Sequence, residues 1–179
     1  MASSRKKVIV RTAANTLHPG YLPLARVVEG TEAQPFVPLL DLEGRITPIP
    51  LETVRSIAYV RDFNLGDRDD PERLTRRTFL ARPRTEGLWL RLTLLGGDLL
   101  EGLAPIDLTL IDGLLDDRGL FLIPPDIRSN TQRLYIPRSA IAAVQLLAVI
   151  TTPSKSKPVA PLAQPGTLQE SLFPDPPHS

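Results

Sequence analysis

Alternating apolar and polar residues predict short β-strands along most of the chain. The clearest case is Leu88–Leu94, where leucines at every second position alternate with Trp89, Arg91 and Thr93. A period of two is typical of a strand with one buried face. Short strands separated by turn residues indicate a barrel or a sandwich. Further strands are predicted at 8–11, 37–42, 45–50, 58–60, 99–103, 108–111, 120–123, 133–136 and 144–149.

Composition divides the chain into four sections. Residues 7–63 form an N-terminal β half, with a turn-rich stretch around His18-Pro19-Gly20, and residues 88–150 form a C-terminal β half. Residues 64–87 form a charged connection, in which an Asp cap before Pro71 predicts a short helix. Residues 151–179, rich in Pro, Ser and Lys, predict a disordered tail because they have little apolar surface to bury.

The two β halves share a repeated motif at a constant offset of 87 residues. In each half a strand ends at an Ile-Pro pair, a single turn follows, and an apolar strand begins. Proline at this point removes one ladder donor and preorganises the turn. The matching residues are Ile49, Pro50, Val54 and Ile57 in the first half and Ile136, Pro137, Ile141 and Val144 in the second.

The C-terminal half resembles a known small barrel. The run Leu90–Leu94, then Gly97-Asp98, Glu101-Gly102-Leu103 and Asp107, followed by Ile136-Pro137-Arg138, is similar to the Sm-like, SH3-type fold. The resemblance implies two SH3-like halves and, as one functional alternative, an Sm-like RNA-binding protein. Residues 82–92 together with 129–133 also resemble an uncharacterised bacterial domain family, which implies no activity.

Composition narrows the function classes. The chain of 179 residues has no cysteine, two histidines and a formal net charge of +1. Disulfides and thiolate chemistry are therefore excluded, and no global field favours nucleic acid or an anionic membrane. Neither a signal peptide nor a catalytic motif is present, so we expect a cytoplasmic, noncatalytic protein without cofactor or metal.

The arginines between 73 and 84 are the first candidate binding site. Arg73 and Arg77, with Asp107, resemble the ligand residues of PilZ domains, which bind cyclic diguanylate on a β-barrel. Guanidinium groups suit phosphates because they form paired hydrogen bonds. The alternative is a solvated arginine face, balanced by the acidic residues between 67 and 72.

A peptide in the tail is the second candidate. Residues 169–173, Gln-Glu-Ser-Leu-Phe, resemble the peptide by which bacterial proteins bind the sliding clamp. There Leu172 and Phe173 would fill an apolar pocket and Gln169 would make a polar anchor. The alternative is a tail without a binding function. A flexible tether that carries an anchoring peptide suits recruitment.

The sequence therefore favours a mostly β protein built from two similar small barrels, with a short helix between them and a disordered tail. The leading functional hypothesis is a noncatalytic binding or adaptor module with a protein partner. The alternatives are a PilZ-like regulator that binds a cyclic dinucleotide and an Sm-like RNA-binding protein.

Overall fold

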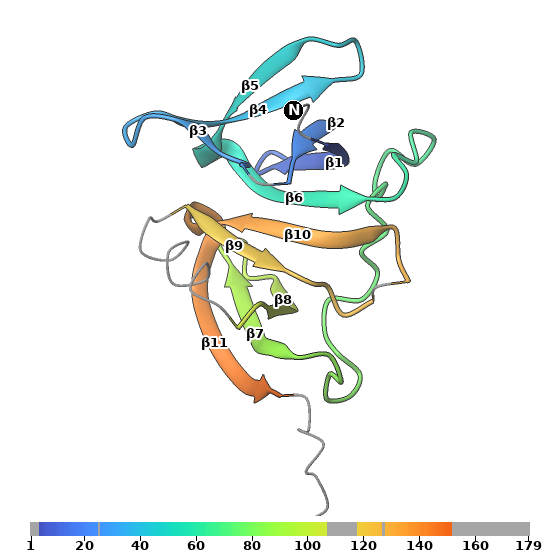
Figure 1. Ribbon diagram of the computed structural model, residues 1–179, viewed down its shortest axis with the longest axis vertical. Coiled ribbons are helices and arrows are strands. Elements are labelled where there is room, and N and C mark those ends of the chain that lie inside the picture. Colours follow the sequence, from blue (N-terminus) through green and yellow to red (C-terminus); the bar gives the residue numbers. More distant parts are fainter. Residues whose placement is uncertain (1–3, 25, 107–117, 127, 152–179) are drawn as a thin grey trace, which may run out of the picture.

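Strands account for most of the regular structure in the computed structural model, which describes residues 4–24, 26–106, 118–126 and 128–151 (Figure 1). A mostly β fold is therefore confirmed. Two single 3-10 turns, η1 (Leu51–Thr53) and η2 (Arg138–Ala140), interrupt the strands. The strands are β1 (Arg5–Thr12), β2 (Leu17–Pro23), β3 (Glu29–Gly30), β4 (Pro35–Asp41), β5 (Ile46–Pro50), β6 (Val54–Val60), β7 (Gly87–Leu94), β8 (Leu99–Ala104), β9 (Gly119–Leu122), β10 (Thr131–Pro137) and β11 (Ile141–Ile150).

The two halves repeat one pattern of strand pairing. In the first half β1 pairs with β2 and β6, β2 pairs with β4, and β4 pairs with β5. In the second half β7 pairs with β8 and β11, and β9 pairs with β10. Strand β8 reaches β9 through two backbone hydrogen bonds between Leu103 and Ile123, of 3.0 and 2.9 Å. The repeat predicted from the sequence is therefore present in the topology.

The Ile-Pro motif forms the same corner in both halves. Pro50 precedes η1 with φ −56° and ψ 129°, and Pro137 precedes η2 with φ −59° and ψ 144°. Each turn is followed at once by the last strand of its half. Because the two prolines have similar backbone conformations, the motif that repeats in the sequence at an offset of 87 residues also repeats in the structure.

Strands β6 and β10 lie side by side and join the first half to β9 and β10 of the second in one eight-stranded sheet, whereas β11, β7 and β8 form a separate three-stranded sheet (Figure 1). Strands β6 and β10 pair antiparallel, with Ile57 opposite Tyr135 and Ala58 opposite Leu134. Ile57 and Tyr135 pack in the core of the first half, whereas Ala58 and Leu134 pack in the core of the second. Each core therefore contains side chains from both halves.

The helix predicted between the halves is absent from residues 64–86, so that prediction was wrong. The Asp67 side chain accepts hydrogen bonds from the backbone N–H groups of Asp69 and Asp70. One turn forms at Pro71 and ends at Arg73, which has a φ of 51°. That left-handed conformation turns the chain out of a helical path, and the rest of the segment runs across the second half.

The turn predicted around His18-Pro19-Gly20 was also wrong, because these residues lie in strand β2. The strand is sandwiched between β1 and β4, and Gly20 pairs with Val8 on one side and Asp41 on the other. Its missing side chain allows Leu39 and the carbonyl of Leu40 to approach closely. Gly20 therefore marks close packing within a strand.

Two further predictions lie outside the described residues: the strand at 108–111 and, from residue 152 onward, the tail. Within the described part of the chain, no helix is long and apolar enough to cross a membrane.

Substitution Gly20→Ala should lower the free energy of unfolding by about 2 kcal/mol, within the range of 1–3 kcal/mol typical of overpacking. A Cβ at Gly20 would lie 2.5 Å from the Leu40 carbonyl oxygen, and the backbone would have to move. Urea denaturation measures the change. Gly96→Ala is the matched control, because a Cβ there meets nothing within 4 Å; an equal loss in both variants would contradict the packing argument.

Candidate functional site: the charged junction between the halves

A cavity of about 320 Å³ lies where the two halves and the connecting segment meet. Apolar side chains of the second core form its floor, and arginines and carboxylates surround it. The lining residues that carry formal charge are Arg11, Arg55, Asp69, Asp70, Glu72 and Arg77. Three positive and three negative side chains therefore balance each other.

Arg11 and Glu72 form the most buried of these pairs. Arg11 Nε and Nη2 donate to the two oxygens of Glu72 at 2.8 and 2.7 Å. Hydrogen bonds to Glu72 raise the pKa of Arg11, although burial opposes them. The backbone carbonyl of Glu72 also accepts a hydrogen bond from the buried Thr131 hydroxyl at 2.8 Å. Glu72 thus ties the connecting segment to β1 of one half and β10 of the other.

Asp98 forms ion pairs with the other two arginines that line the junction cavity, Arg55 and Arg77. It lies in the turn between β7 and β8, forms an ion pair with Arg55 of β6, and lies 3.5 Å from Arg77 of the connecting segment. An anionic ligand at this place would have to displace the Asp98 carboxylate from both arginines. The geometry therefore describes an internal ion-pair network that closes the junction.

Glu101 forms a second polar centre, on β8. Its side chain is 2% exposed and accepts hydrogen bonds from the Phe79 backbone N–H, the Trp89 indole and the Arg91 guanidinium, at 2.7 to 3.1 Å. Burial raises the pKa of Glu101, but these hydrogen bonds outweigh it and the net pKa is lowered. The carboxylate fixes the connecting segment onto the second half, and Trp89 has a polar partner as well as a packing role.

The two sequence-predicted arginines line different hollows. Arg77 lines the junction cavity, whereas Arg73 is exposed and borders two shallow hollows around Asn64. Asp107 lies outside the described residues, as do Gln169, Leu172 and Phe173 of the tail peptide. The cyclic dinucleotide clamp of Arg73, Arg77 and Asp107 therefore stays a prediction.

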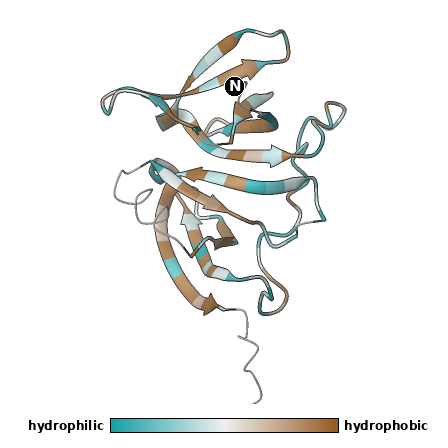
Figure 2. Cartoon of the chain, viewed as in Figure 1, coloured by the Kyte–Doolittle hydropathy of each residue, from teal (hydrophilic) through white to brown (hydrophobic). Residues whose placement is uncertain are grey.

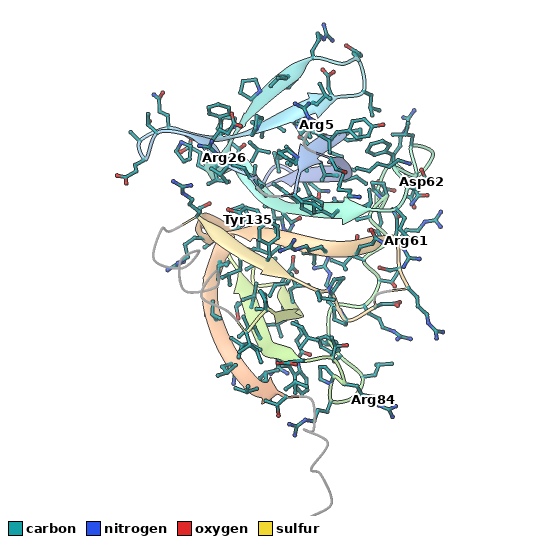
Figure 3. The ribbon with its side chains drawn as sticks, in the orientation of Figure 1. Arg5, Arg26, Arg61, Asp62, Arg84 and Tyr135 are labelled. Carbon is teal, nitrogen blue, oxygen red and sulfur yellow. The ribbon has the colours of Figure 1, made fainter. Side chains whose placement is uncertain are left out.

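Asn130, in the loop between β9 and β10, binds the beginning of the connecting segment. Asn130 donates hydrogen bonds from its side-chain amide to the carbonyls of Asp62 and Pro71, at 2.7 and 2.8 Å, and its carbonyl oxygen accepts from the Asp62 N–H at 2.9 Å. Figure 3 shows Arg61 and Asp62 at this end of the junction, and Tyr135 between the halves. Asn130 is thus a structural bridge.

Sequence reasoning missed Glu101, Asp98 and the pair of Arg11 with Glu72. A signal for Glu101 was present: Arg91 and Glu101 each lie five residues from Gly96, and a hairpin that turns at Gly96 places such residues opposite each other. No comparable signal exists for Arg11 and Glu72, because 61 residues separate them and their contact depends on the path of the connecting segment.

The fold and this junction define a β protein made of two fused, similarly connected halves whose buried charges are paired. The chain belongs to a family of unknown function (DUF6982), whose model matches residues 4–148. The match spans both halves and the connecting segment, and it confirms the expected membership of an uncharacterised domain family. No curated protein and no solved structure matches the chain.

Glu101→Gln should lower the free energy of unfolding by about 3 kcal/mol at pH 7, because an amide nitrogen would face donors that now bind a carboxylate. A carboxyl whose folded pKa is lowered stabilises the fold above its unfolded pKa and loses that contribution as pH falls. The difference in the free energy of unfolding between the wild type and Glu101→Gln should therefore become smaller below a pH of about 4.

Urea denaturation at pH 7 and at pH 3.5 measures this difference. The exposed Glu32 supplies the control, and Glu32→Gln should change stability by less than about 0.5 kcal/mol. A loss in Glu101→Gln that is the same at both pH values would contradict the role of the carboxylate charge.

Proposed function

We propose that the chain is a noncatalytic binding or adaptor module and that its partner contacts strand β11. The observation that carries this proposal is the exposure of three apolar side chains along β11. Val144 is 43% exposed, Leu146 54% and Val149 47%. Apolar side chains grouped on one strand are a feature of interaction surfaces.

These three residues lie on the face of the sheet that forms the core of the second half. Val144 pairs with Leu92 of β7 and Leu146 pairs with Leu90, and both leucines are buried. Paired residues in an antiparallel sheet lie on the same face. On this face of the sheet, the paired side chains of β7 are therefore buried, whereas those of β11 are exposed to solvent.

Strand β6, the last strand of the first half, is the equivalent of β11, and its equivalent side chains are buried. Ile57 and Tyr59, at the offset of 87 residues from Val144 and Leu146, are 0% and 3% exposed. They are covered because β10 pairs with β6 and places Tyr135 in the same core. The equivalent edge of β11 has no such neighbour among the described residues, and a partner would supply it.

Three further points support a binding role. The charged side chains of the junction bind each other, and every buried side-chain polar atom of the described residues has a hydrogen-bond partner. The shared strand connectivity of the halves supports our inference that each is a small barrel of the SH3 or Sm-like type. Extended peptides commonly bind by adding a strand to an open sheet edge.

In-cell photo-crosslinking tests the proposal. A benzoylphenylalanine in place of Leu146 should give a discrete covalent adduct in cells that naturally make the protein. The same probe at Leu65, which is similarly exposed but lies in the connecting segment, is the control. Absence of an adduct at position 146 above the level seen at position 65 would overturn the proposed role of β11.

A sliding clamp is a candidate partner of the adaptor because residues 169–173 of the tail carry the matching peptide. In a pulldown with purified bacterial clamp, Leu172→Ala/Phe173→Ala should reduce recovery at least tenfold, since both side chains would leave the apolar pocket. Leu162→Ala, in the same tail but outside the peptide, is the control. Equal recovery of clamp by all variants would remove the motif.

A further inference from the structure

Apart from the two-residue β3, two strands among the described residues, β5 and β11, each pair with a single strand and present their second edge outward. An open edge is a row of donors and acceptors that other strands can join, and proteins commonly protect such edges with proline, charge or short length. The edges of β5 and β11 differ strongly in how far they are protected against an added strand. The less protected edge is the better candidate for binding a strand of a partner.

The outer edge of β5 is blocked by proline. Pro48 of β5 lies opposite Pro38 of β4. Neither has an N–H, so this pair makes no mutual hydrogen bonds, and the nitrogen of Pro48 faces the outer edge. The next residue with this orientation is Pro50, which also has no donor. Strand β5 therefore offers a poor edge for strand addition.

Strand β11 has none of these protections. It spans ten residues, Ile141–Ile150, without proline or a charged side chain. Figure 2 shows apolar colours along most of the strand, and Gln145 is its one polar residue. Its core face presents Val144, Leu146 and Val149 to solvent. A strand of this kind pairs readily with another extended strand.

We infer that β11 pairs antiparallel with β11 of a second copy of this chain, around a two-fold axis that crosses the strand. This inference rests on the proposed binding role of β11 and names its occupant. Pairing would join two three-stranded sheets, each ordered β11-β7-β8, into one continuous sheet of six strands. A two-fold interface of this kind uses the same surface on both copies.

Self-pairing fits the chemistry of the strand. An antiparallel copy brings like faces together, so the exposed stripe of Val144, Leu146 and Val149 meets its own equivalent and extends the core of the second half. No like charges oppose each other, because the strand carries none. Pairing of β11 with β5 of the second copy would repeat the pairing of β6 with β10, in which Tyr135 lies opposite Ile57. It is disfavoured because Pro48, the equivalent of Tyr135 at the offset of 87 residues, has no N–H to donate.

Sedimentation equilibrium of the full-length protein measures the association. We expect a dimer, twice the chain mass of 19.7 kDa, at a concentration of about 20 μM, which exceeds a dissociation constant of about 1 μM. Leu146→Lys should weaken it at least about 100-fold, because each copy would bury an ammonium group without a partner in the apolar stripe. Leu65→Lys should leave the dimer intact, and circular dichroism should show all three proteins folded.

Single cysteines define the geometry, since the chain has no cysteine of its own. Mild oxidation of variants with one cysteine between positions 142 and 149 should give the most disulfide dimer at one central position, with a symmetric decline on both sides. A mixture of Ile46→Cys and Leu146→Cys should give no mixed disulfide above background. A strong mixed disulfide would assign the contact to β5 and overturn the two-fold arrangement.

The outcomes separate this inference from the proposed function. A monomeric wild type together with a photo-adduct to a different protein at position 146 would overturn self-pairing and leave the binding role standing. In a monomeric wild type, protection from hydrogen exchange of the β11 amides that point away from β7 would show that the chain covers its own strand, and it would overturn both. A dimer that Leu146→Lys does not weaken would also overturn self-pairing.

Discussion

The pairing of β6 with β10 is the interaction on which the rest of the structure depends. Strand β6 takes part in two ladders, one with β1 of its own half and one with β10 of the other. Its side chains alternate between the two cores, as a period of two requires, so Ile57 completes one core and Ala58 the other. The halves resemble each other in connectivity, but they form a single cooperative unit because neither core is complete without the other half.

The connecting segment also holds the two halves together. It crosses from the end of β6 to the start of β7 and packs two apolar side chains on the second half, Leu74 on its core and Phe79 on Trp89. Polar contacts complete its attachment, through Glu72 to Arg11 and Thr131, and through the backbone around residues 77–79 to Glu101 on β8. Of the arginines between 73 and 84, Arg77 is engaged within the chain through its ion pair with Asp98.

The strands and the repeat could be predicted because they depend on local signals. The alternation in Leu88–Leu94 and the Ile-Pro corners at Pro50 and Pro137 are each contained in a few residues. The helix start at Asp70-Pro71 was equally clear locally, yet the turn ends at Arg73, because Asn64 and Asn130 bind the Pro71 carbonyl and Arg11 binds Glu72. The burial of Glu72 and the conversion of the Pro19-Gly20 turn signal into a strand depend on partners distant in sequence, which local patterns do not contain.

The prolines of β5 have a consequence for the size of any assembly. A protein with two open edges at opposite ends can add copies without limit and grow into a fibre. Here the edge of β5 is a poor acceptor, since Pro48 and Pro50 offer no donors. Two copies joined through β11 would present β5 and the two-residue β3 outward, so such an assembly would stop at two copies. In that arrangement the prolines of β5 would limit the size of the assembly.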